Sequence, residues 1–208
     1  FGTDPTAFTL PAEFRPEERV YVEIGLCNSA KGRLYIQPNG VAQVLPLNTD
    51  SQCFTSLDGV SYDPTSHGHK TLTLLNGWGG EPFATSAPAA SLVDGVVHLK
   101  GAMSGGASSA PFTLPVEFRP ETRTYVPVDL YLGAKGRLVI DTTGTVTIDP
   151  LGPFTDASNF TSLDGAKFVA RPNRFQPLAL QNGWSGAPFS TAEPAVAMID
   201  GVVHFKGA

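Results

Sequence analysis

Apolar residues alternate with other residues along several short segments of this chain. Residues 20–26 read VYVEIGL, with an apolar side chain at every second position, and residues 124–130 read TYVPVDL, which keeps most of that pattern. A period of two places alternate side chains on one face of an extended strand. Each segment therefore predicts a strand with one buried face.

Other segments carry the same period next to turn residues. Residues 32–44 (GRLYIQPNGVAQV) and 136–148 (GRLVIDTTGTVTI) predict two strands that meet at a glycine turn. In SLVDGVVHLKG, at residues 91–101, the Asp-Gly pair favours a two-residue hairpin turn. Residues 71–78 and 177–184 each add a strand that ends at Asn-Gly. About six or seven short strands per hundred residues are typical of a β-sandwich or a small β-barrel.

The chain contains two copies of one sequence. The matching pairs are 8–36 with 112–140, FTSLDG at 54–59 with 160–165, NGW at 76–78 with 182–184, and DGVVHLKGA at 94–102 with DGVVHFKGA at 200–208. Repetition of this kind indicates a duplicated structural unit. We therefore expect an all-β fold made of two tandem homologous β-sandwich or small-barrel units.

The boundary between the two units is open. One division gives a first β repeat at residues 1–102 and a second at 103–208. The alternative division makes 72–168 one unit and joins 172–208 with 1–64 as the other. In the alternative, the C-terminal strand pairs with the N-terminal unit and covers an otherwise exposed sheet edge.

Two cysteines occur in the first copy only. Cys27 and Cys53 align with Tyr131 and Asn159 of the second copy. Their joint presence and joint absence predict a disulfide between them, and two independent buried thiols are the alternative. A disulfide would indicate an oxidising compartment, and hence a protein that is secreted or exposed on a cell or virion surface.

The composition narrows the classes of partner. The 22 glycines and 18 prolines indicate many turns and argue against long helices. The net charge of −5 comes from scattered residues, so we expect no binding to nucleic acid. No apolar stretch approaches the roughly 20 residues that span a bilayer, so we expect no membrane insertion. The first residues do not read as a secretion signal, so export would require its earlier removal.

Residue types that carry catalysis or metal binding do not form a convincing set. His98 and His204 fall mid-strand on the polar side of the alternation, where we expect solvated side chains. The two histidines of HGH at 67–69 lack a third ligand nearby in the sequence. We therefore expect no catalytic residue, no metal and no cofactor. A glycan-cleaving enzyme that uses scattered carboxylates remains an alternative.

The candidate ligand-binding residues gather around the two tryptophans. Trp78 and Trp184 each follow an Asn-Gly pair, which includes Asn76 or Asn182, in glycine-rich surroundings. An indole beside an amide suits a sugar, whose C–H face stacks on the ring. The alternative is that each tryptophan fills the core and each asparagine only forms a turn.

Two aspartates join this candidate set. Asp58 and Asp164 precede glycine in the repeated motif SLDG. Aspartate before glycine is an ordinary turn residue, and it is also a hydrogen-bonding group for a sugar hydroxyl. Both interpretations stay open.

The motifs NGW, DGVVHLKG, FTLPxEFRP and FTSLDG, in this circular order, resemble β-rich modules at the tips of bacteriophage tail fibres and in secreted actinobacterial proteins. The resemblance spans nearly all of both copies. In that family the tryptophan segment precedes the GVVHLKG strand and the FTLPxxFRP segment, which favours the alternative division. It implies a non-catalytic module that binds cell-surface glycan as part of a larger chain or an oligomer.

These observations predict a carbohydrate-binding, lectin-like or receptor-recognition protein with two related sites. Two modest sites on one rigid body would raise avidity for a polymeric glycan. The alternative is a structural spacer or adhesion module that has no small-molecule site.

Overall fold

The structure is a computed structural model that describes residues 2–172 and 174–208. It consists mainly of short antiparallel strands, and the part it describes has two short α-helices, α1 (Thr49–Cys53) and α2 (Phe154–Asn159). Single turns of 3₁₀ helix occur at Ala12–Phe14, Cys27–Ser29, Pro82–Ala84, Val116–Phe118, Tyr131–Gly133 and Pro188–Ser190. The predicted all-β fold is confirmed. None of the described helices has the length or apolar character needed to span a bilayer.

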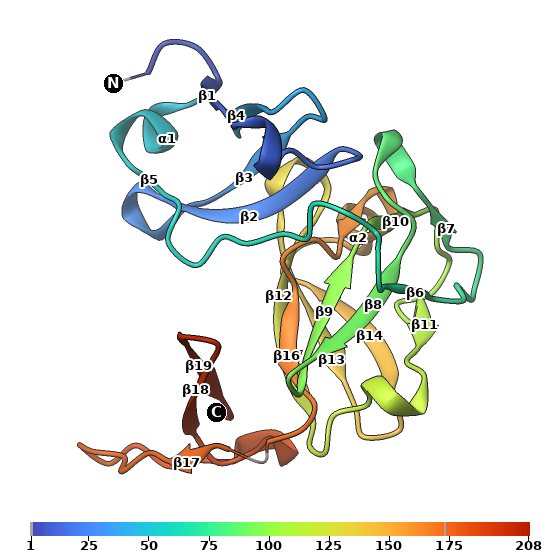
Figure 1. The fold of residues 1–208 in the computed structure, drawn as a ribbon, viewed down its shortest axis with the longest axis vertical. Helices are drawn as coiled ribbons and strands as arrows, with labels where there is room; N and C mark the ends of the chain where they lie inside the picture. Colours follow the sequence, from blue (N-terminus) through green and yellow to red (C-terminus); the bar gives the residue numbers. More distant parts are fainter. Residues whose placement is uncertain (1, 173) are drawn as a thin grey trace.

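Residues 2–64 form what we call the N-terminal half-unit (Figure 1, top). Its sheet has the order β1-β4-β3-β2-β5, with β1 at Thr6–Thr9, β2 at Val20–Leu26, β3 at Lys31–Ile36, β4 at Val41–Leu45 and β5 at Thr55–Ser56. The residues of β2 alternate between buried and half-buried, as the sequence predicted. The buried face packs under side chains of the same half-unit, including Phe8 and Tyr62.

Residues 70–170 form the central unit, which holds the largest apolar core of the molecule. Three sheets enclose that core, with the orders β16-β9-β8-β6, β11-β14-β13-β12 and β15-β10-β7. The strands are β6 (Lys70–Thr71), β7 (Gly79–Gly80), β8 (Ala89–Val93), β9 (Val96–Lys100), β10 (Ala102–Ser104), β11 (Phe112–Thr113), β12 (Thr124–Asp129), β13 (Lys135–Ile140), β14 (Thr145–Pro150), β15 (Thr161–Ser162) and β16 (Lys167–Val169). The core combines the segment of the first copy that contains Trp78 with the FTLPVEFRP segment of the second copy.

Residues 174–208 form the C-terminal half-unit, whose small sheet has the order β17-β18-β19. Its strands are β17 (Gln176–Pro177), β18 (Ala195–Ile199) and β19 (Val202–Lys206). The Asp-Gly hairpin predicted from the sequence joins β18 to β19, and Asp200 and Gly201 have positive φ angles of 48° and 77°. The equivalent hairpin of the central unit joins β8 to β9.

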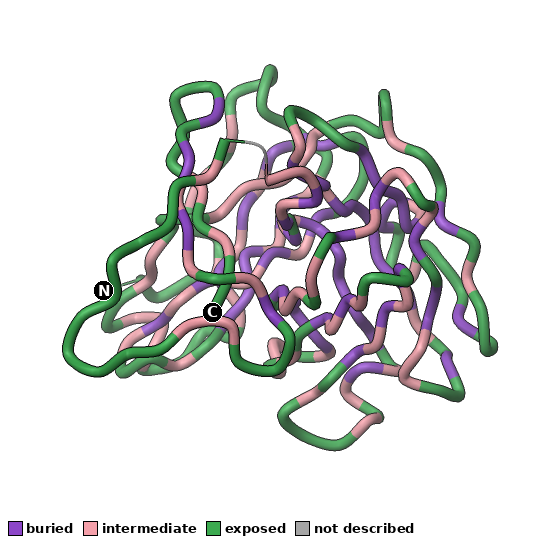
Figure 2. The backbone as a smooth tube through the Cα atoms, turned by 90° about the horizontal axis from the view of Figure 1, so that it is seen from below, coloured by how far each residue is buried: buried purple, intermediate pink, exposed green. Residues whose placement is uncertain are grey.

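Pairing between the C-terminal strand and the N-terminal unit does not form. Within the described chain, β19 pairs only with β18. Instead, Ala197 and Ile199 of β18 pack on Val96 of the central unit. The N-terminal half-unit covers its own buried face, and the two half-units are attached to different parts of the central unit. Figure 2 shows buried residues concentrated in the body of the molecule and long exposed stretches near both termini.

Candidate functional site

Trp78 lies in the core of the central unit and is 6% exposed. Its Nε1 donates a hydrogen bond to the carbonyl of Ser108 at 2.8 Å, and the ring meets Phe154 edge-on at 6.3 Å. A Cβ added at Gly106 would lie 1.9 Å from the indole, so only glycine allows this approach. The indole therefore joins the first copy to the segment that opens the second.

Trp184 has the same local sequence but is 78% exposed. Asn76 and Asn182 each have a φ of 53° and form the same turn before their tryptophans. Nδ2 of Asn76 donates to the carbonyl of Ala110 at 2.8 Å, so its side chain fastens the same two segments that Trp78 joins. The structure thus places the two predicted sugar sites in different surroundings.

The two candidate aspartates also differ. Asp58 is exposed in a turn, where its backbone N–H donates to the hydroxyl of Ser56 at 3.2 Å. Asp164 is buried, and its Oδ1 accepts the N–H of Gly101 at 2.9 Å, whereas its Oδ2 has no hydrogen-bond partner. Burial raises the pKa of the Asp164 carboxyl to about 6. The hydrogen bond from Gly101 lowers this pKa, but its effect is smaller than that of burial.

The predicted disulfide between Cys27 and Cys53 is present. It joins the turn after β2 to the end of α1, with a Cα–Cα distance of 5.8 Å. It therefore closes a covalent loop within the N-terminal half-unit.

A histidine cluster lies where β8 and β9 meet residue Asp63 of the N-terminal half-unit. Nε2 of His69 is 3.3 Å from both Asp63 Oδ2 and Ser91 Oγ, and Nδ1 of His98 is 3.8 Å from the same carboxylate oxygen. A catalytic Ser-His-Asp relay instead engages opposite nitrogens of the ring. No group of three or more potential metal ligands is found in the described ranges 2–172 and 174–208.

His98, whose side chain we expected to be solvated, is only partly exposed. Its side chain is 30% exposed, and desolvation lowers its pKa despite the nearby Asp63 carboxylate. Lys100, two residues along β9, is 1% exposed and donates from Nζ to the carbonyl of Asp63 at 2.7 Å. The N-terminal half-unit covers this face, and a single-sheet alternation does not reveal that contact.

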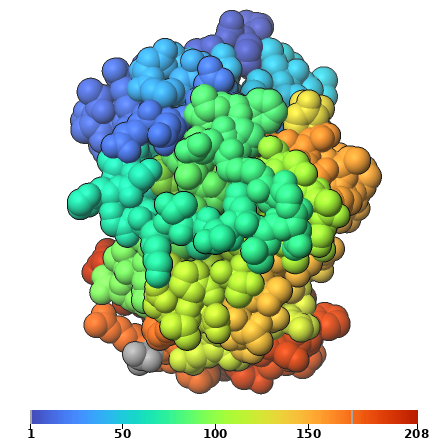
Figure 3. All heavy atoms as spheres, turned by 90° about the vertical axis from the view of Figure 1, so that its right-hand side faces the viewer, coloured from blue at the N-terminus to red at the C-terminus, as the bar shows by residue number. Residues whose placement is uncertain are grey.

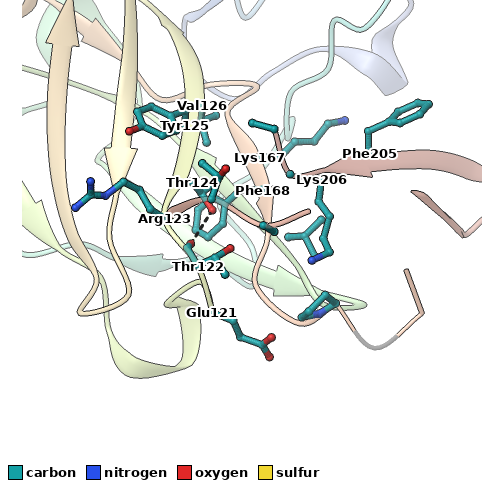
Figure 4. Close-up of a pocket in the computed structure, with 16 residues that line it drawn as sticks. Glu121, Thr122, Arg123, Thr124, Tyr125, Val126, Lys167, Phe168, Phe205 and Lys206 are labelled. Atoms are coloured by element: carbon teal, nitrogen blue, oxygen red, sulfur yellow. Dashed lines mark hydrogen bonds between the residues drawn. The ribbon is translucent and has the colours of Figure 1, made fainter. Parts of the chain in front are cut away.

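A cleft with a volume of about 220 Å³ lies between the central unit and the C-terminal half-unit (Figure 4). Thr122 and Thr124 line it at the start of β12, beside Glu121 and Arg123, and Lys206 enters from β19. The side chain of Lys167 on β16 also lines it, but its ammonium group donates to the Ser61 hydroxyl of the N-terminal half-unit at 3.3 Å. The Thr124 hydroxyl donates to the carbonyl of Thr122 at 3.1 Å. The cleft therefore combines hydroxyl groups with side chains of both charges.

The sequence did not single out this cleft, because it arises only when the C-terminal half-unit rests on the central unit. The backbone N–H of Arg123 donates to the carbonyl of Ser190 at 3.2 Å and ties the two parts together beside the cleft. Lys206 lies two residues after His204 in the repeated DGVVHxKGA segment, which gives no information about its neighbours in space.

A buried ion pair joins the N-terminal half-unit to the central unit. Nε of Arg33, on β3, lies 3.2 Å from Oδ2 of Asp129, on β12, and the two side chains are 9% and 2% exposed. A guanidinium N–H of Arg33 also donates to the carbonyl of Leu130. Burial raises the pKa of Asp129 to about 7, although the charge of Arg33 lowers it. The Nε and Oδ2 atoms have no hydrogen-bond partner within the described chain, so the pair is a close charge contact between the two parts.

Aromatic rings surround this ion pair. The Arg33 guanidinium carbon lies 5.5 Å from the ring centroids of both Tyr21 and Phe160, and Tyr21 stacks on Tyr35 at 4.7 Å. The hydroxyl of Ser162 donates to the carbonyl of Tyr21 at 2.6 Å. Arg137, which aligns with Arg33, instead makes an exposed ion pair with Asp149 at 2.7 Å.

Comparison with known protein families, curated proteins and solved structures returns no match for the chain.

Proposed function

We propose that this chain is a non-catalytic structural and adhesion module that holds neighbouring parts of a surface assembly in fixed positions. The burial of Trp78 carries the proposal. An indole that donates its N–H to a backbone carbonyl and packs against Phe154 serves cohesion between segments. A sugar cannot stack on a ring that the protein itself covers.

The junction between the N-terminal half-unit and the central unit supports a role that needs rigidity. Arg33 is held there by an ion pair, a backbone carbonyl and two aromatic rings, and each contact limits its orientation. Inter-unit surfaces without such specific contacts usually allow relative motion. A fixed junction suits a spacer that presents other domains at a defined angle.

Small-angle X-ray scattering of Arg33→Ala tests this role. Removing one partner of a buried ion pair costs about 3–5 kcal/mol, so we expect the junction to loosen and the radius of gyration to increase. Arg137→Ala is the matched control, because its ion pair with Asp149 is exposed and should contribute at most about 1 kcal/mol. A wild-type protein that already samples many shapes, or an Arg33→Ala protein of unchanged shape, would contradict the proposal.

A second candidate function is glycan recognition in the cleft between the central unit and the C-terminal half-unit. The hydroxyls of Thr122 and Thr124 and the ammonium group of Lys206 support it. Such groups suit a sugar that carries a carboxylate. This candidate moves the site away from Trp78.

A glycan array separates the two candidates. If the cleft binds glycan, Lys206→Gln should reduce binding about tenfold or more, since a charged hydrogen bond contributes about 1.5–3 kcal/mol. Trp184→Ala, outside the cleft, should leave binding unchanged. Absence of saturable binding by the wild-type protein would remove the glycan candidate and leave the structural role.

The disulfide and the resemblance to tail-fibre and secreted modules support a location outside the reducing cytosol. We propose a secreted or surface-exposed protein, on a cell or a virion. Finding Cys27 and Cys53 reduced in protein from its native source would contradict this location.

A further inference from the structure

The central unit shows where a tryptophan of this motif docks. Trp78 packs against the segment that opens the second copy, in a core that also includes Phe112, Ile148 of β14 and Leu163. Gly106 provides the close approach and Ser108 accepts the indole N–H. Leu163, of the SLDG turn, is buried in the same core.

The N-terminal half-unit carries the counterpart of this docking site as an open groove of about 370 Å³. Positions 104 or 106 residues earlier in the sequence supply its walls. The groove includes Gly2, Asp4, Phe8, Val44 and Leu57, the counterparts of Gly106, Ser108, Phe112, Ile148 and Leu163. Leu57 is 47% exposed, whereas Leu163 is 0% exposed, so the site that receives an indole in the central unit is uncovered here.

The C-terminal half-unit carries the matching projection. Trp184 is 78% exposed and Phe205 is 71% exposed, whereas their counterparts Trp78 and Leu99 are 6% and 2% exposed. A concentration of exposed apolar side chains marks an interaction surface. In this half-unit the exposed large apolar residues are Leu178, Leu180, Trp184, Phe189, Met198, Val202, Val203 and Phe205. The groove and the projection correspond to the two surfaces that meet around Trp78 in the central unit.

The strand edges agree with this pairing. In the central unit β9 pairs with β16, where Val97 lies opposite Phe168. The counterparts are Val203, on the edge of β19 that no other described strand pairs, and Tyr62, which follows the SLDG turn outside any strand. A sheet edge with apolar neighbours favours addition of a further strand.

We propose that the C-terminal half-unit of one copy docks on the N-terminal half-unit of a second copy, with Trp184 in the groove beside Leu57. The two surfaces differ, so the contact is head-to-tail and each copy keeps one free surface for the next. The interface extends the structural role proposed above and rests on it, because both treat the tryptophan motif as a packing element.

The occupant is a second copy because the two half-units are attached far apart on the same molecule. The N-terminal half-unit is fixed through Arg33 and Asp129, and the C-terminal half-unit rests on Val96. Figures 1 and 3 place the blue N-terminal residues at one end of the long axis and the red and orange C-terminal residues at the other. Closure within one chain would require one of these attachments to break.

Sedimentation of the intact chain over a concentration series tests the interface. We expect the wild-type mass to rise with concentration. Trp184→Ala removes the projection and Leu57→Arg blocks the groove, and each should weaken self-association about tenfold or more, as expected for a central interface anchor. Val116→Arg is the matched control, because Val116 is 69% exposed in the central unit and its counterpart Ala12 is exposed as well.

Mixing the two variants gives the sharpest result. Trp184→Ala keeps its groove and Leu57→Arg keeps its projection, so the mixture should form a one-to-one dimer that grows no further. A wild-type chain that stays monomeric at every concentration overturns the proposal. This holds even if Trp184 proves to be buried within its own chain. Failure of the mixture to associate also overturns it. In either case the scattering of the Arg33→Ala protein still reports separately on the junction.

Discussion

Trp78 and Trp184 occupy equivalent places in the sequence, but their surroundings differ. Each follows Asn-Gly in the same turn, and each has an asparagine with a φ of 53°. Trp78 is covered because the segment at residues 106–112 packs against its indole. No corresponding segment of the described chain covers Trp184. Exposure at this position therefore depends on contacts between segments and not on the local motif.

This difference predicts unequal costs for the same substitution. Trp78→Ala should destabilise the protein by about 3–5 kcal/mol, the usual range for a large aromatic residue removed from a core. Trp184→Ala should change the stability of the monomer by no more than about 0.5 kcal/mol. Urea unfolding followed by circular dichroism, at a concentration where the chain is monomeric, measures both, and equal costs would contradict the packing role of Trp78.

The buried carboxyl of Asp164 makes the stability of the folded protein depend on pH. Its folded pKa, about 6, lies above the ordinary value of 3.8 because burial disfavours the carboxylate. The folded state therefore favours the protonated form, and the resulting stability is present below about pH 4 and is lost as the pH rises through 6.

Asp164→Asn should reduce this pH dependence. The amide oxygen can still accept the Gly101 N–H, and the side chain carries no charge to bury. We expect the free energy of unfolding of the wild type to fall by about 2–3 kcal/mol more than that of the variant between pH 4 and pH 7. Denaturant titrations at several pH values measure the difference, and parallel profiles for the two proteins would count against the buried carboxylate. The raised pKa of Asp129 acts in the same direction in both proteins.

At the scale of elements, local patterns predicted several strands, but the strands predicted at 71–78 and 177–184 are wrong. Only Lys70–Thr71 and Gln176–Pro177 are strands there, with an isolated bridge at Leu74. The period-two segments became β2 and β12, and the Asp-Gly hairpins became β8–β9 and β18–β19. The paired occurrence of Cys27 and Cys53 predicted the disulfide, because two residues lost together report a shared contact. These features are predictable because the strand and hairpin patterns span only a few residues, and the disulfide is marked by one pair of aligned positions.

The disulfide should stabilise the N-terminal half-unit specifically. Its cysteines are 26 positions apart, and closing a loop of that length removes unfolded-state entropy worth about 3 kcal/mol. In the double variant Cys27→Ser with Cys53→Ser, hydrogen exchange should therefore accelerate in β2 and β3 and stay unchanged in β13. Equal acceleration in β3 and β13 would show that the two parts unfold together.

At the scale of the whole molecule, the contacts between distant segments were beyond prediction from the sequence. Arg33 and Arg137 share one motif, yet one is buried at a junction and the other is exposed. The alternation in β9 did not predict the burial of Lys100, because its partner carbonyl belongs to Asp63. The cleft near Lys206 likewise depends on where the C-terminal half-unit rests.

The account depends most on the claim that the tryptophan motif is a packing element of a β unit. The most direct test is the fluorescence of Trp184→Phe, in which Trp78 is the single tryptophan. We predict a blue-shifted emission that iodide does not quench and that added glycans do not change. A red-shifted emission that iodide quenches and that a glycan protects would contradict the account.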